Sequence, residues 1–201
     1  MKNFLKKRWP WLLALTALIA VLIFLLVRCD GQDAMMPTLT VETPQKLSKS
    51  ETTEFTLDVT ISNLGDALYP AMSMSIAFDA SRLEFLGVEE GNVFVYDTEN
   101  TTGQQLPEWS YDVASSNASG KINIMYLDLT GGKHAFSKNL LVEEDNVVLR
   151  LRFRLKGSVR AGDVMDLVVE DAVFAASDEV LSLAMTRDTL RVRNGKLVIG
   201  E

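Results

Sequence analysis

Apolar and polar residues alternate one by one in several segments between residues 38 and 201. Since successive side chains of a strand point to opposite faces of a sheet, this alternation predicts strands with one buried face. The clearest segments are EFTLDVTIS at 54–62, AMSMSIAF at 71–78, LEFLGVEEG at 83–91, KINIMYL at 121–127 and NVVLRLRFRLK at 146–156, the longest of them. EWSYDV at 108–113 predicts a strand with Trp109, Tyr111 and Val113 on one face. Shorter candidates are DLVVED at 166–171 and VLSLAM at 180–185.

These segments predict an all-β fold. Turn residues separate them, Asn194-Gly195 indicates a tight turn or bulge near the C-terminus, and no amphipathic helix of ten residues or more is expected in this region. We expect about nine strands in a two-layer antiparallel β-sandwich of the jelly-roll type. In 71–78, Met72, Met74, Ile76 and Phe78 would face the core, while the opposite face carries only small side chains.

A different pattern precedes this region, because residues 9–27 contain no charged side chain. A helix of this length reaches roughly 28 Å, which matches the hydrocarbon core of a bilayer. Four basic residues precede the run and only Arg28 follows it directly, so the positive-inside rule places the N-terminus in the cytoplasm. We expect a cytoplasmic segment at 1–8, a single transmembrane helix at 9–28, a linker at 29–37 and an extracytoplasmic domain at 38–201, at the plasma (inner) membrane.

Two other fates of the N-terminus stay open. The apolar run would serve as a cleaved signal peptide, although it is longer than such segments usually are and lacks small residues at its end. Alternatively, cleavage before Cys29 would leave that residue as a lipidation site, with Arg28 in the position that normally holds a small residue. Cys29 is the only cysteine, so no intramolecular disulfide stabilises the domain.

Charge and chemistry exclude several function classes. The first 29 residues hold five basic and no acidic residues of the chain's 20 and 27, so the remainder carries a net charge of −12 and would repel nucleic acid. The chain has a single histidine, His134, so a Ser-His-Asp or Cys-His catalytic triad finds little support. The sequence also contains no Cys/His cluster that would bind zinc and no glycine-rich loop that would bind phosphate. We therefore expect neither an enzyme, nor a cofactor, nor a metal site.

From 39 to 200 the chain resembles the cohesin family, the β-sandwich receptors of cellulosome scaffolds, which are related in fold to some cellulose-binding modules. The resemblance rests on the Phe78-Asp79-Ala80 turn, on Leu83, Phe85, Gly87-Val88 and Gly91 after it, on Gly120-Lys121-Ile122, on VVLRLRFRLKG, on Ala161-Gly162-Asp163 and on Asn194-Gly195-Lys196-Leu197-Val198. Cohesins usually have proline where this chain has Ala80. The resemblance implies a protein partner that carries a dockerin.

The same resemblance points to a partner-binding surface. The outward positions of the strand before the Phe78-Asp79 turn, together with those of the strand that resembles its sheet neighbour, form a flat platform with an apolar centre. Its residues are Ala71, Ser73, Ser75, Ala77, Asn123, Met125 and Leu127. At the positions of Ala71 and Ser73, cohesins often carry Asn and Asp side chains that form hydrogen bonds to the dockerin. This chain therefore lacks those common hydrogen bonds. The alternative is an ordinary sheet face, covered by the loop at 96–107.

Three further interpretations remain. Trp109 and Tyr111 would form a compact carbohydrate-stacking pair if their shared face were outward, although a place in the core is the commoner outcome. The basic row Arg150, Arg152, Arg154 and Lys156 would pair with acids such as Glu54, Asp58 and Asp166, or else bind an acidic polysaccharide. Lastly, the domain would be a structural component of an envelope or secretion complex. Asn100 and Asn117 lie in N-glycosylation sequons, and we assign no function to either.

Overall fold

A computed structural model describes residues 36–49, 53–64, 67–92, 108–129, 135–137, 146–177 and 184–201. The chain divides into two compact units, Met1–Met36 and Pro37–Glu201, and all the described strands belong to the second unit. The transmembrane helix expected at 9–28 and Cys29 lie outside the described residues. Within the described ranges, no helix has the length and apolarity needed to cross a bilayer.

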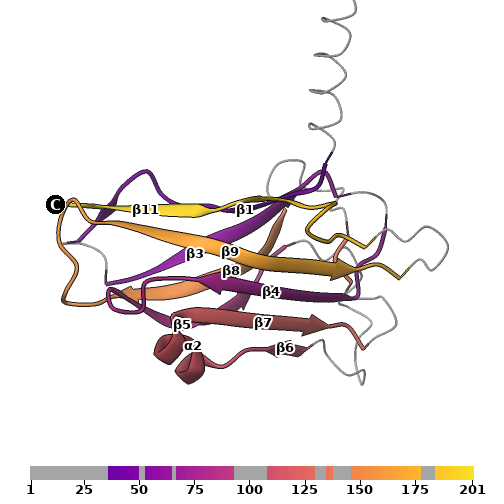
Figure 1. The fold of residues 1–201 in the computed structure, drawn as a ribbon, viewed down its shortest axis with the longest axis horizontal. Helices are drawn as coiled ribbons and strands as arrows, with labels where there is room; N and C mark the ends of the chain where they lie inside the picture. The colour runs from indigo at the N-terminus through magenta and orange to yellow at the C-terminus, as the bar shows by residue number, and fades with distance from the viewer. Residues whose placement is uncertain are drawn as a thin grey trace, which may run out of the picture. The chain divides into compact units, whose positions relative to one another are not determined.

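The second unit is a β-sandwich of two sheets packed face to face (Figure 1). One sheet has the order β10-β1-β3-β8-β5, with β1 at Thr38–Val41, β3 at Glu54–Ser62, β5 at Leu83–Glu90, β8 at Val147–Leu155 and β10 at Arg191–Arg193. The other has the order β2-β11-β9-β4-β7-β6, with β2 at Leu47–Ser48, β4 at Ala71–Ala77, β6 at Glu108–Ser110, β7 at Lys121–Leu127, β9 at Val164–Ala175 and β11 at Gly195–Gly200.

The core lies between the sheets and consists mainly of the side chains that the alternating sequence pattern predicts to face inward. The buried residues of the four clearest strands are Leu57, Val59 and Ile61 in β3, Met72, Met74 and Ile76 in β4, Ile122, Ile124 and Tyr126 in β7, and Val147, Val148, Leu149, Leu151 and Phe153 in β8. These inward faces are confirmed. Since both sheets and this core lie within Pro37–Glu201, residues 34–201 contain everything the fold requires.

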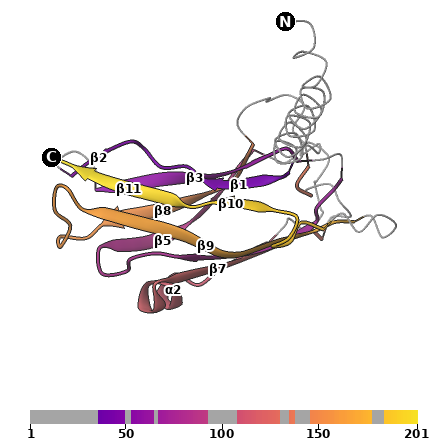
Figure 2. The same ribbon diagram turned by 45° about the horizontal axis from the view of Figure 1, so that its top comes forward.

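The expected strand count and pairing need correction. The described residues form eleven strands rather than about nine, and two of the strand pairs, β1 with β10 and β2 with β11, are parallel. β2, β6 and β10 are only two or three residues long, too short to produce a recognisable alternation. The Asn194-Gly195 step is the point where the chain passes from β10 in one sheet to β11 in the other (Figure 2).

β9, with twelve residues, is the longest described strand, whereas the sequence pattern predicted only a short strand at 166–171 there and made β8 the longest. A β-bulge explains the difference. The partners of Ser75 and Ile76 are Asp171 and Val169, so Glu170 is an extra residue in β9. Burial therefore alternates up to Val169 and resumes out of phase at Ala172. Asn194 stabilises this point, because its side-chain Oδ1 accepts a hydrogen bond from the Val169 amide at 3.0 Å.

The strand predicted at 108–113 is too long, because β6 ends at Ser110 and the helix α2 begins at Val113 and ends at Ser119. Asp112 caps the helix, its side chain accepting a hydrogen bond from the Ser115 amide. At the other end Gly120 adopts φ 70°, the left-handed conformation typical of a helix C-cap. Val113 therefore belongs to a helix and does not share a strand face with Trp109.

α2 packs against β5 through Asn117, whose side chain bonds the backbone of that edge strand. Its Oδ1 accepts from the Phe85 amide at 2.8 Å, and its Nδ2 donates to the Phe85 carbonyl at 2.8 Å and to the Val113 carbonyl at 2.9 Å. The amide thus satisfies backbone groups that the edge of a sheet would otherwise leave open. Because both Nδ2 bonds are made within the domain, a glycan at this sequon would disrupt them.

Replacing Asn117 with alanine is expected to lower the free energy of unfolding by about 2 kcal/mol, because partly buried backbone groups of Phe85 lose their partners. Urea titration of residues 34–201 measures the change. Asn123→Ala is the matched control, since that exposed asparagine accepts a hydrogen bond from the Ser75 hydroxyl at the surface and its loss should cost less than about 0.5 kcal/mol. Equal losses in the two variants would contradict the role of Asn117.

Candidate functional site

The structure brings the seven residues of the predicted platform onto one outer face. β4 and β7 are antiparallel neighbours, and their register places Ala71 opposite Leu127, Ser73 opposite Met125 and Ser75 opposite Asn123. Partners in such a register point to the same side of a sheet, here the side away from the buried Met72 and Tyr126. We call this surface, with Ala71, Ser73, Ser75, Ala77, Asn123, Met125 and Leu127, the β4–β7 face.

One end of the β4–β7 face is apolar and raised. Met125 is 62% exposed and Leu127 47% exposed, unusually high values for large apolar side chains in the middle of a sheet. Met125 lies between two serines, Ser73 on β4 and Ser110 on β6, so small side chains flank it on both sides. Met125 and Leu127 therefore form a ridge, which Leu129, 49% exposed, follows along the chain.

The other end of the face is polar and internally bonded. The Ser75 hydroxyl donates to Asn123 Oδ1 at 2.7 Å, and Lys121 Nζ lies 2.6 Å from a carboxylate oxygen of Glu170. Lys121 is on β7 and Glu170 on β9, so their ion pair spans the small residues of β4 between them. This ion pair explains why some of the outward side chains of β4 are small, because larger side chains would obstruct the contact between Lys121 and Glu170.

β9 adds residues that the sequence did not assign to this surface. Its register places Val173 beside Ser73 and Asp171 beside Ser75, on the outer side of the sheet. The sequence offered no signal for them, because the bulge at Glu170 breaks the alternation that would have placed them on a face. The loop at 96–107, the alternative cover for the face, lies outside the described residues.

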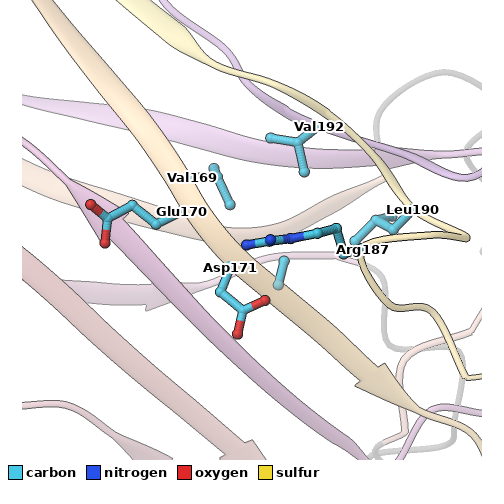
Figure 3. A pocket seen from close by; sticks show the side chains of 7 residues that line it. Val169, Glu170, Asp171, Arg187, Leu190 and Val192 are labelled. Carbon is cyan, nitrogen blue, oxygen red and sulfur yellow. The ribbon is translucent and has the colours of Figure 1, made fainter.

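A cavity of about 260 Å³ lies beside the bulge (Figure 3). Val169, Ala172, Leu190 and Val192 supply its apolar lining, and Glu170, Asp171 and Arg187 supply its charged lining. Arg187 comes from the turn before β10 and extends toward β9. The two acids thus border both the cavity and the polar end of the β4–β7 face.

Comparison with known proteins identifies the fold. Residues 38–191 match the Cohesin domain family. The chain belongs to the cohesin family. This match covers most of the β-sandwich and confirms the resemblance seen in the sequence.

Solved cohesin structures share the fold at low sequence identity. The third cohesin of ScaC from Acetivibrio cellulolyticus, in complex with the ScaB dockerin, is 14% identical with a TM-score of 0.60, covering 83% of this chain and 100% of its own. The OlpA cohesin of Clostridium thermocellum, in complex with Doc918, is 17% identical with a TM-score of 0.60, covering 82% and 99%. CaCohA2 from Clostridium acetobutylicum is 22% identical with a TM-score of 0.54, covering 82% and 91%. No curated protein matches the chain significantly.

In this cohesin, Trp109 and Tyr111 do not form a stacking pair on an outward strand face. Trp109 packs against Tyr126, with ring centroids 4.8 Å apart, and against Phe136 at 6.2 Å. Its indole Nε1 is buried and has no hydrogen-bond partner in the described part of the chain. Tyr111 follows the end of β6 and packs edge-on against Phe85 at 6.0 Å. Burial raises the pKa of the neighbouring Tyr126 hydroxyl above its ordinary value.

The basic row of β8 is largely paired with acids on both neighbouring strands. Arg150 pairs with Asp58 at 3.2 Å, Arg152 with Glu89 at 3.3 Å, and Arg154 with both Glu54 at 2.5 Å and Glu84 at 3.1 Å. The pairing with Glu54 and Asp58 is confirmed. Asp166 is not a partner, because it lies opposite Lys196 in the other sheet. The hydrogen bond from Arg154 lowers the pKa of Glu54 below its ordinary value.

Lys156, the last residue of the row, donates to the Ala80 carbonyl at 2.5 Å. The outer face of the β3–β8–β5 layer is therefore a set of internally paired charges, which offers few unpaired cations to an acidic polysaccharide. Within the described residues no cluster of three His, Cys, Asp or Glu side chains is arranged to hold a metal ion. His134 lies outside those residues.

Proposed function

We propose that this cohesin module docks a dockerin-bearing protein on its β4–β7 face, without catalysing a reaction. The observation that carries the proposal is the exposed ridge of Met125 and Leu127 beside a flat row of small side chains. A partner surface can lie close to such a face and exclude water from it. By contrast, the outer face of the other sheet has its charges paired within the module.

Family membership supports the choice of partner. Among similar structures, cohesins from Acetivibrio cellulolyticus and Clostridium thermocellum are in complex with dockerins. We further propose that residues 9–28 anchor the module in the plasma (inner) membrane, with residues 1–8 in the cytoplasm and the sandwich outside. The uncharged run and the basic residues before it support this location.

A double substitution of Ser73 and Ser75 by arginine tests the docking surface. Two long charged side chains would hold a partner away from the face, so we expect affinity for a dockerin to fall about 100-fold or more, about 2.7 kcal/mol. Calorimetric titration of residues 34–201 with dockerins encoded in the same genome, and with Doc918 of Clostridium thermocellum, gives the dissociation constants.

The matched control adds the same two charges in the other sheet, with Thr53→Arg just before β3 and Ser62→Arg at its last residue, and should change the affinity less than about threefold. Equal weakening by both double variants would place docking elsewhere. Binding of none of the dockerins by the native module would refute the proposed function.

A further inference from the structure

The polar groups of the β4–β7 face are largely committed to one another. Ser75 donates to Asn123 at 2.7 Å, and Lys121 lies 2.6 Å from Glu170. A partner that formed hydrogen bonds or ion pairs with these groups would first have to break the short contacts that they make within the module. Such an exchange yields little net free energy, because each bond gained replaces a bond lost.

The apolar end of the same face has no such internal partners. Its large side chains are among the most exposed apolar groups of the described chain, with Met125 at 62%, Leu127 at 47% and Leu129 at 49%. The adjoining residues of β4 and β9, Ala71, Ser73 and Val173, carry no ionisable group, whereas on the β6 side Glu108 stands opposite Leu127 in the register. On the β4 side the patch is uncharged and apolar, and it complements a partner segment that is itself uncharged, because a buried charge would find no counterion there.

The charged groups near the face balance one another at its far end. Glu170 is paired with Lys121, and Asp171 borders the same cavity as Arg187. Two acids and two bases therefore meet around the bulge, and the polar end presents no strong field of either sign to a partner.

We propose that the partner, the dockerin of the proposed function on which this inference rests, docks on the ridge of Met125 and Leu127 through uncharged aliphatic side chains. The Ser75–Asn123 and Lys121–Glu170 contacts stay intact in the complex. The aliphatic side chains pack over the ridge and cover the small residues Ala71 and Ser73 of β4 beside it. A methionine in the centre of the contact adapts its shape to the partner, since its side chain is unbranched and polarisable. Binding then depends on apolar burial and only weakly on salt.

Two aspartate variants test the apolar ridge. Met125→Asp adds a charge at the centre of the ridge on β7, and Thr56→Asp adds the same charge at an exposed position of β3, in the other sheet. We expect Met125→Asp to weaken dockerin binding at least about 30-fold and Thr56→Asp less than about threefold.

Calorimetric titration of residues 34–201 with the same dockerins, in about 0.05 M and about 0.5 M NaCl, provides the measurement. The native dissociation constant should differ less than about threefold between the two salt concentrations, because apolar contacts are not screened. In a methionine-methyl NMR spectrum, the Met125 signal should shift on adding the dockerin. Both substitutions are at exposed positions, and thermal unfolding verifies that each variant is folded.

The outcomes separate this inference from the function beneath it. Native binding that weakens more than about tenfold in high salt argues against docking through the apolar ridge and leaves docking on the β4–β7 face intact. Native binding that Met125→Asp leaves unchanged, or that Thr56→Asp weakens equally, argues against the ridge and moves the contact off β7. If the native module binds none of the dockerins, the proposed function fails and this inference fails with it.

Discussion

Phe153→Ala is expected to lower the free energy of unfolding by about 4 kcal/mol, within the range for truncating a buried aromatic side chain. Phe153 has no exposed surface and lies in β8, between β3 and β5. Its ring contacts three other rings, with centroids 5.9 Å from Phe55, 5.5 Å from Phe78 and 5.7 Å from Phe85. Removing it leaves a cavity among rigid aromatic side chains that cannot easily close.

Chemical denaturation of residues 34–201, with the midpoint and slope fitted together, measures this loss. Phe55→Ala is the matched control, because Phe55 pairs with Phe153 across the strands but is only partly buried. It should cost about half as much or less. A loss below about 1.5 kcal/mol for Phe153→Ala would show that the core collapses around the vacancy.

The same variant separates stability from docking. Phe153 belongs to the sheet opposite the β4–β7 face, and its ring is buried between the sheets. At a temperature where the variant is still folded, we therefore expect its dockerin affinity to match that of the native module. The face depends on the local register of β4 and β7 rather than on the packing of β8.

Alternation in the sequence was sufficient to predict the core strands, because in β3, β4, β7 and β8 each inward side chain is large and apolar. It failed where the period of two is interrupted. The extra residue Glu170 shifted the phase of β9, so only a short strand at 166–171 was predicted within this twelve-residue strand. The short helix α2 was missed because its signals are at its ends, in Asp112 and Gly120, rather than in an amphipathic repeat.

The candidate site was predictable only in part. The inward residues of β4 and β7 implied their outward ones, but the pairing of the two strands came from the family resemblance and not from periodicity. Contacts that cross three strands, such as Lys121 with Glu170, depend on register and on the bulge, neither of which the pattern specifies. For the same reason Asp166 was assigned to the wrong sheet, since acidic residues give no indication of which strand faces them.

Gly91→Ala is expected to destabilise the domain by about 3 kcal/mol, because no room exists for a side chain at this position. A Cβ there would lie 1.8 Å from the Val147 carbonyl oxygen and 2.7 Å from the Val148 carbonyl carbon, both backbone atoms of β8. These atoms belong to buried residues and cannot rotate away as a side chain would. Gly91 is also one of the positions that carry the cohesin resemblance, and this close approach gives it a physical reason.

The clash would also break the hydrogen bonds that join the end of β5 to the start of β8. The Asn92 amide donates to the Val147 carbonyl at 2.7 Å, and the Val147 amide donates to Asn92 Oδ1 at 2.7 Å. Separating the two chains enough to admit a methyl group lengthens both bonds, and the buried groups of Val147 lose their partners.

Gly157→Ala is the matched control, since a Cβ at Gly157 meets no atom within 4 Å. There the substitution should be neutral or stabilising by about 0.5 kcal/mol, because alanine restricts the unfolded chain more than glycine does. Thermal and urea unfolding of both variants provide the comparison. If Gly91→Ala proved as harmless as Gly157→Ala, the close contact between the end of β5 and the start of β8 would have to be relaxed in solution.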